Sequence, residues 1–262
     1  MPMVQYEKQR HIVAVTINRP EAMNALNLDT FLELSSAFQD FRDDDDAWVA
    51  ILTGAGERAF SAGADLKAMS GDRHPDSWSG PWWDHLHNPQ LHRGLELYKP
   101  VIAAVNGHCH AGGLNLMLAC DIRIAADHAS FSLAQVRRGI IPGNGGTQRL
   151  PRELPYAIAM EMLLFGTVMD APTAMHFGMV NRVVPMAELR DTAMEYAERL
   201  CAESAPLSVR AIKQAVLRGM TMPLDQAIFM ESLLAQRIRE TEDAKEGPRA
   251  FAERRKPVWK GR

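Results

Sequence analysis

Two turns built from small residues stand out as places where the backbone itself could do chemistry. The first spans residues 60–67 and the second spans 106–113, directly before an apolar helical pattern. Gly112 and Gly113 therefore fall at a predicted helix N-terminus, where N–H groups lack helical partners and the helix dipole is positive. Such donors stabilise the oxyanion of a thioester enolate or a tetrahedral intermediate. A glycine pair at a strand–helix junction more often serves tight packing, so each turn alone indicates little.

Side chains that could bind metal or act as nucleophiles are also present. A segment between Met69 and Lys99 is rich in tryptophan and histidine: Trp78, Trp82, Trp83, His74, His85, His87 and His92. It contains no HxxxH pair beside a carboxylate, so we predict no metal site and expect a mobile flap over an apolar ligand pocket. Cys109 and Cys120 lie near the second turn but lack a His/Asp relay in the sequence, which argues against a covalent cysteine mechanism.

The whole chain limits the classes of function further. Its 262 residues are 47% hydrophobic and 23% charged with a formal net charge of −3, so neither nucleic acid nor an anionic membrane is an expected partner. The odd, sparse cysteine count of three favours neither a disulfide framework nor a structural zinc site. With no leader pattern and no apolar run long enough to span a bilayer, we expect a cytoplasmic protein.

The predicted elements change character along the chain. Strands are expected at 11–17, 48–53, 101–105, 122–125 and 130–133, and an amphipathic helix at 28–41. Helical patterns dominate after Thr147, at 156–165, 186–201, 206–218, 224–240 and 245–255, with one strand-like run at 180–184. Asp121 and Arg123 are expected to form a structural polar pair. This order predicts an α/β core over residues 1–200 and a C-terminal helical region over 201–262.

Four motifs follow one another in the middle of the chain: 99–107 (KPVIAAVNG), 111–113 (AGG), 119–125 (ACDIRIA) and 139–150 (GIIPGNGGTQRL). Together and in this order they resemble the central signature of the crotonase superfamily, the enoyl-CoA hydratase/isomerase family. Further matches at 18–20 (NRP), 24–26 (NAL), 61–67, 177–181 (FGMVN) and 250–257 (AFAERRKP) extend the resemblance over essentially the whole chain.

The resemblance implies a fold, a substrate carrier and a set of site residues. The fold would be a spiral of ββα units with a C-terminal helical region that mediates assembly into a homotrimer or a dimer of trimers. Coenzyme A would carry the substrate as a thioester, with no permanently bound cofactor. The backbone amides of Ala64 and Gly112 match the family's oxyanion hole. Residues Ala64, Asp65, Leu66 and Lys67 would line the path of coenzyme A, and Arg58 and Lys67 are either phosphate neighbours or ordinary surface cations.

One part of the family pattern is missing. Family hydratases place one glutamate on the helix after the glycines and a second after the following strands, and the two act as acid and base. The matching positions here are Asn115 and Gln135, and the acid of some isomerases corresponds to Gly143–Asn144. A carboxamide can hold a water or a carbonyl by hydrogen bonds, but it does not exchange protons usefully near neutral pH.

Three functions therefore remain open. The first is a hydratase/isomerase-type enzyme whose proton transfer has moved to another residue, with His110, Asp84 and His85 as candidates. The second is another reaction of the same scaffold: thioester hydrolysis, decarboxylation or C–C bond hydrolysis. The third is a non-catalytic acyl-CoA-binding protein.

Overall fold

The computed structural model describes residues 2–65 and 89–262, and the structural statements below refer to those residues. Most of the predicted flap lies outside this range. So do Asp84 and His85, and the two coenzyme A candidates Leu66 and Lys67.

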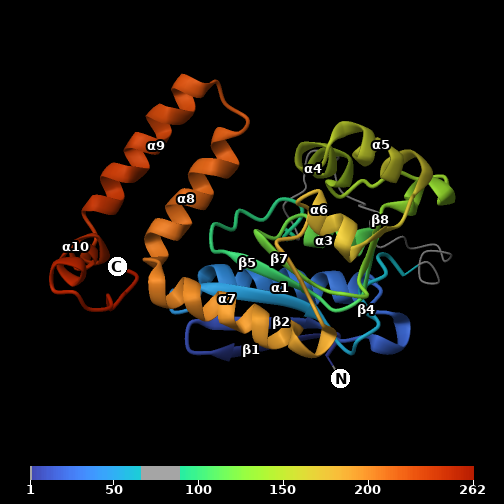
Figure 1. The fold of residues 1–262 in the computed structure, drawn as a ribbon, viewed down its shortest axis with the longest axis horizontal. Helices are drawn as coiled ribbons and strands as arrows, with labels where there is room; N and C mark the ends of the chain where they lie inside the picture. Colours follow the sequence, from blue (N-terminus) through green and yellow to red (C-terminus); the bar gives the residue numbers. More distant parts are fainter. Residues whose placement is uncertain (1, 66–88) are drawn as a thin grey trace.

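A six-stranded sheet forms the centre of the molecule (Figure 1). Its strands, in spatial order, are β1 (Val4–Gln9), β2 (Ile12–Ile17), β3 (Val49–Gly54), β5 (Val101–Val105), β7 (Ile122–Ala126) and β10 (Arg182–Val184). Only β1 and β2 pair antiparallel, and every other neighbouring pair is parallel. The inner strands are buried along most of their length, as expected for parallel strands covered on both faces.

A smaller sheet stands at one end of the first. Its order is β4 (Ala59–Ser61), β6 (His108–His110), β8 (Ser130–Ser132) and β9 (Met169–Asp170), with only β8–β9 antiparallel. Strands β3, β5 and β7 each lead into a strand of this second sheet, and β6 then leads into helix α3 (Gly112–Met117). The chain therefore repeats a ββα path, which places the two small-residue turns side by side at β4 and β6.

Helices cover both faces of the large sheet. Helix α1 (Leu28–Asp43) begins where Asn27 Oδ1 accepts a hydrogen bond from Thr30 N, and it buries the predicted apolar stripe. Helix α7 (Leu189–Glu203) packs on β3, β5 and β7 through a second core cluster that includes Ile51, Ile102 and Ile124. The remaining short helices are η1 (Pro20–Ala22), η2 (Ala134–Arg138), α4 (Gly146–Glu153), α5 (Tyr156–Phe165), α6 (Ala171–His176) and η3 (Met186–Glu188).

The last three helices leave the sheets. Helices α8 (Pro206–Gly219), α9 (Leu224–Arg239) and α10 (Glu242–Ala252) form an arm that extends beyond the core in Figure 1. The boundary predicted between residues 200 and 201 falls inside α7. Among the described residues, no helix combines the length and the apolar character needed to cross a membrane.

The sequence analysis predicted the long helices and strands but not several of the short ones. The strands and helices predicted at the ranges given above are present, with shifted ends. The predicted turn at 60–67 begins inside strand β4, the turn at 106–113 contains strand β6, and β1, β9, α4 and α6 were not predicted. The expected pair of Asp121 with Arg123 is wrong: Asp121 binds Lys213 Nζ at 2.7 Å, whereas Arg123 pairs with Glu153.

Candidate active site

Two buried asparagines join the large sheet to the small one. Asn106, at the end of β5, accepts a hydrogen bond from Gly54 N at 3.1 Å and donates to the carbonyls of Gly54 and Gly56 at 2.8 and 2.7 Å. Asn24 donates to the carbonyls of Ala55 and Ala59 at 3.0 and 2.6 Å. These bonds hold the β3–β4 turn against β5, so they fix where the chain enters the first small-residue turn.

The two turns approach so closely that only glycine fits between them. Gly63 has φ +89°, and a Cβ built there would lie 2.7 Å from both Gly112 N and the Ala111 Cβ. A Cβ on Gly113 would lie 2.3 Å from the Ser61 carbonyl oxygen. Glycine is therefore required at Gly63 and Gly113 for close backbone contact.

This contact places the amides of Ala64 and Gly112 next to each other. An ideal Cβ on Gly112 would stand 3.5 Å from Ala64 N. The neighbours of Ala64 bind Leu26, with Leu26 N donating to Gly63 O at 2.8 Å and Asp65 N donating to Leu26 O at 2.9 Å. Groups alternate in direction along an extended chain, so the Ala64 N–H faces away from Leu26. Gly112 opens α3 and has no acceptor within that helix.

Ala111 sets the sharp turn from β6 into α3. Its φ of 48° and ψ of −113° are unusual for a residue with a side chain, and such strain costs about 1–3 kcal/mol. The turn is stabilised from both sides: Ala111 N donates to Ser132 O at 2.8 Å, and Ala111 O accepts from Asn115 N at 3.1 Å. The surrounding hydrogen bonds therefore hold the start of α3 in one orientation.

The two carboxamides at the expected glutamate positions each bury an oxygen atom. Asn115 is 2% exposed, and neither its Oδ1 nor the buried Oε1 of Gln135 has a hydrogen-bond partner among residues 2–65 and 89–262. A Cβ on Gly146 would lie 2.4 Å from Asn115 Oδ1, so Asn115 points at the first residue of α4. Buried polar atoms are nearly always paired, and such exceptions call for a ligand, a water or strain as their explanation.

His110 takes part in a small polar cluster on the second sheet. Its Nε2 lies 3.0 Å from Ser130 Oγ, and His108 Nδ1 lies 2.7 Å from the same oxygen. Burial, followed by the nearby His108, lowers the pKa of His110 below its usual value. The imidazole is therefore neutral near pH 7, with one ring nitrogen already in a hydrogen bond.

The N-terminal NRP motif contributes to the site through an ion pair. Arg19 Nη2 donates to Asp65 Oδ2 at 2.9 Å, and Arg19 Nη1 donates to Ala25 O at 2.5 Å. Arg19 thus anchors the residue that follows Ala64. Sequence reasoning treated this motif as a family marker only, and its spacing of 46 residues from Asp65 carries no local signal.

Neither a cysteine nucleophile nor a metal site is found among the described residues. Cys109 and Cys120 are buried, and burial raises the pKa of Cys109 well above its ordinary value and that of Cys120 to about 12. Neither thiol is a thiolate near neutral pH. No cluster of three or more His, Cys, Asp or Glu side chains suited to a metal ion occurs within residues 2–65 and 89–262.

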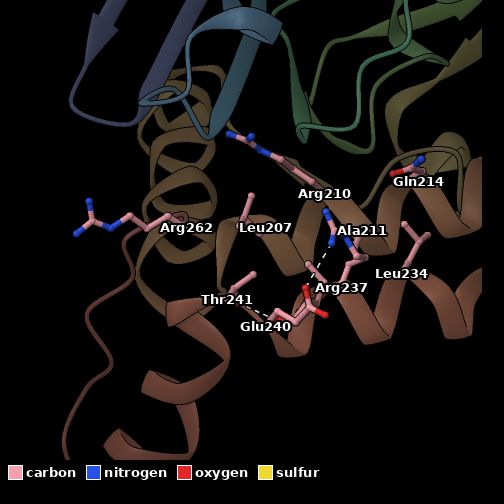
Figure 2. A pocket seen from close by; sticks show the side chains of 10 residues that line it. Leu207, Arg210, Ala211, Gln214, Leu234, Arg237, Glu240, Thr241 and Arg262 are labelled. Carbon is pink, nitrogen blue, oxygen red and sulfur yellow. Dashed lines mark hydrogen bonds and ion pairs between the residues drawn. The ribbon is translucent and has the colours of Figure 1, made fainter.

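A hollow unrelated to these residues lies between α8 and α9 (Figure 2). It measures about 470 Å³ and is lined by Leu207, Arg210, Ala211, Gln214, Leu234, Arg237, Ile238, Glu240, Thr241 and Arg262. All of these residues belong to the arm or the chain end, and none belongs to the elements that carry Ala64 and Gly112. We therefore do not assign the chemistry to this hollow.

The ββα repeat and the two converging small-residue turns are those of a crotonase-type α/β fold. A sequence profile described as enoyl-CoA hydratase/isomerase matches residues 7–262, and the chain belongs to this family. It is 43% identical over 259 residues to an (E)-benzylidenesuccinyl-CoA hydratase of Thauera aromatica, covering 98% of this chain and 99% of the relative. It is 46% identical over 255 residues to a carnitinyl-CoA dehydratase of Escherichia coli K12, covering 96% and 95%.

Solved structures agree with this assignment. An enoyl-CoA hydratase of Mycobacterium tuberculosis superposes with a TM-score of 0.90 at 36% identity, covering all of both chains. One from Bacillus anthracis gives a TM-score of 0.90 at 36% identity, covering 99% of this chain and 100% of the other. The predicted family and the predicted α/β fold with C-terminal helices are therefore confirmed.

Proposed function

We propose that the protein is an acyl-CoA lyase of the enoyl-CoA hydratase type in which the amides of Ala64 and Gly112 bind the thioester oxygen. The observation that carries this proposal is the approach of these two residues, enforced at Gly63 and Gly113. Two preorganised N–H donors stabilise the negative charge that develops on a thioester oxygen when an enolate forms. The names of the relatives associate related chains with the addition or removal of water on CoA thioesters.

Coenzyme A would be held by the chain that follows the first turn. Ala64, Asp65, Leu66 and Lys67 are the proposed path of the pantetheine arm, with Asp65 anchored by Arg19. The thioester is a substrate carrier in this proposal, and no permanent cofactor is required for enolate chemistry.

Asn115 and Gln135 would hold a water or a substrate carbonyl rather than transfer a proton. Each carries a buried oxygen without a partner, which suits a hydrogen bond to a ligand. Proton transfer then needs another group, for which His110 is our candidate because a neutral imidazole can accept a proton.

The arm formed by α8–α10 is the proposed assembly region of a homotrimer or dimer of trimers. Its large apolar residues are exposed, among them Leu224 at 75% and Phe229 at 66%.

The carboxamides also favour a second candidate on the same scaffold. Thioester hydrolysis, decarboxylation and C–C bond hydrolysis all use an oxyanion hole and place their proton donors differently. A non-catalytic acyl-CoA-binding protein is the third candidate, and it is distinguished from the others by the absence of turnover of any acyl-CoA.

The test compares crotonyl-CoA hydration by the wild type with that by the Asn115→Glu, Gln135→Glu double variant. Loss of the conjugated thioester's ultraviolet absorbance reports the reaction. We expect slow hydration by the wild type and a gain of about a hundredfold or more in the double variant, the typical contribution of a positioned acid or base. A gain shows that the scaffold and the oxyanion hole are competent.

Equally fast hydration by the wild type would show that another residue already transfers the proton. His110→Gln should then abolish that activity, with His176→Gln, on the separate helix α6, as the matched control. If neither protein hydrates crotonyl-CoA but both bind it, the second and third candidates gain support.

A further inference from the structure

One buried histidine lies outside the expected site residues. His92 is 3% exposed, and neither its Nδ1 nor its Nε2 has a hydrogen-bond partner within the described part of the chain. Two residues earlier, Gln90 is 9% exposed and its Oε1 is unpartnered as well. Leaving such groups without a partner costs stability, so their retention in the core needs an explanation.

His92 contacts two helices, α1 and α4, that adjoin residues of the proposed site. Its ring centroid is 6.3 Å from that of Phe31 in α1. That helix starts beside Leu26, whose Cδ1 would lie 3.4 Å from a Cβ on Gly112.

His92 is also connected to Asn115, through helix α4. His92 O accepts a hydrogen bond from Arg149 Nη2 at 3.0 Å. Arg149 lies one turn along α4 from Gly146, the residue that faces Asn115 Oδ1. The segment that holds His92 is therefore linked through α1 to the neighbourhood of Gly112, and through α4 to that of Asn115.

The backbone around His92 is held in place. Gln90 N donates to Arg93 O and Arg93 N donates to Gln90 O, both at 2.8 Å, which closes a tight turn around His92. Burial, with smaller contributions from Arg149 and Arg93, lowers the pKa of His92 to about 3. The imidazole is therefore neutral, with one donor and one acceptor nitrogen.

We propose that His92 and Gln90 line the acyl end of the thioester site and bind a hydroxyl or carboxylate on the acyl group. The substrate class is then CoA thioesters with a polar acyl substituent, not plain hydrocarbon chains. This inference rests on the proposed function, because it places an acyl-CoA at Ala64 and Gly112. A site built to hydrogen-bond a polar group discriminates strongly against an analogue that lacks it.

The test uses two series of thioesters that differ only at the end of the acyl chain. Butyryl-, 4-hydroxybutyryl- and succinyl-CoA form the short series, and hexanoyl-, 6-hydroxyhexanoyl- and adipoyl-CoA form the long one. Their dissociation constants are measured by calorimetry. We expect the wild type to bind a polar member at least about tenfold more tightly than the methyl member of the same length.

His92→Phe removes both ring nitrogens and keeps a ring of similar size. It should reduce that preference to within about twofold, leave binding of the methyl member unchanged or tighter, and leave the melting temperature at or above that of the wild type. His92→Gln retains a donor and an acceptor and should keep part of the preference. The matched control is His11→Phe, at a histidine stacked on Trp48 at the far edge of the large sheet, and it should change nothing in the binding series.

Three results would overturn the inference while leaving the proposed function intact. They are equal binding of polar and methyl members by the wild type in both series, an equal loss for all members in His92→Phe, and a lower melting temperature in His92→Phe with the preference kept. If no thioester binds the wild type, the proposed function itself fails. Should His92→Phe not fold, Gln90→Leu and the wild-type preference still decide the matter.

Discussion

Two pairs of carboxamide side chains in this protein, Asn24 with Asn106 and Asn115 with Gln135, differ in their hydrogen bonds. Asn24 and Asn106 bind backbone groups through both their oxygen and their nitrogen atoms: Asn106 binds the β3–β4 turn through both, and Asn24 binds Arg19 N through its oxygen and the carbonyls of Ala55 and Ala59 through its nitrogen. Asn115 and Gln135 each bury an oxygen that no described residue contacts by a hydrogen bond. The carboxamide group therefore stabilises the backbone in the first pair, whereas in the second pair its oxygen can still accept a hydrogen bond from a ligand. Stability should depend on the first pair, and ligand binding or catalysis on the second.

The largest expected effect is at the first pair. Asn106→Ala leaves Gly54 N and the carbonyls of Gly54 and Gly56 without their partner inside the core. Each buried group left unpaired costs about 1–3 kcal/mol, so we expect the free energy of unfolding to fall by roughly 3 kcal/mol or more. Urea unfolding at a fixed protein concentration measures it. A loss below about 1 kcal/mol would show that the turn is held by other contacts.

The next effect is on activity, at the close approach of the two turns. Gly63→Ala places a methyl group 2.7 Å from Gly112 N, so it should separate the two amides of the proposed oxyanion hole. We expect kcat/KM for the protein's best CoA thioester to fall about a hundredfold or more, the cost of losing one such donor. The comparison requires a variant with the same backbone strain and no contact.

Gly178→Ala supplies that control. Gly178 has φ +77°, close to the φ of +89° at Gly63, but nothing lies within 4 Å of its added Cβ. This variant should lose stability and keep its kcat/KM. Equal losses of kcat/KM in the two variants would mean that strain, and not the approach of the turns, controls activity.

The buried cation Lys99 allows the contribution of a hydrogen-bonded buried group to stability to be tested by changing the pH. Lys99 is 2% exposed and donates to the carbonyls of Phe41 and Asp44 at 2.7 and 2.5 Å, so it belongs with the fully paired groups. Burial lowers its pKa to about 8 from the ordinary value of 10.5. Between these two values the unfolded chain binds more protons than the folded chain, so the contribution of Lys99 to stability rises with pH across that window.

The variant Lys99→Met tests this sign. The difference in unfolding free energy between wild type and variant should grow in favour of the wild type from pH 8 to pH 10 and be constant from pH 6 to pH 7. A difference that stays constant over the whole range would show that the pKa of Lys99 is the same in both states.

How far the sequence predicts this molecule depends on where the information lies. The stripe of α1 repeats at the helical period, and residues 101–105 form a short, fully apolar run closed by Asn106 and Gly107, so the local sequence is sufficient to find both. Strands β4 and β6 have only three residues each, and they form because distant residues pair, Ala59 with His108 and Ser61 with Cys109. No local sequence pattern predicts a pairing between residues so far apart, so the sequence analysis predicted turns at these positions.

The site follows the same division. Ala64, Gly112, Asn115 and Gln135 were selected by resemblance, and the structure brings Ala64 to Gly112 through contacts at Gly63 and Gly113. His92 was noted only as one of several histidines in an aromatic segment. Its burial and lack of partners come from α1 and α4, which are distant in sequence.

The smallest expected effect is at Asn115, and it is the sharpest test of the comparison because the expected change in stability is close to zero. Asn115→Ala removes a buried amide whose oxygen binds nothing in the described part of the chain, so no partner is left unsatisfied. Alanine also has the higher helix propensity at this position in α3. We expect the free energy of unfolding to change by less than about 0.5 kcal/mol, in contrast to Asn106→Ala, when both are measured in one urea series. A loss comparable to that of Asn106→Ala would place Asn115 with the structural pair and remove the main reason for assigning it to the site.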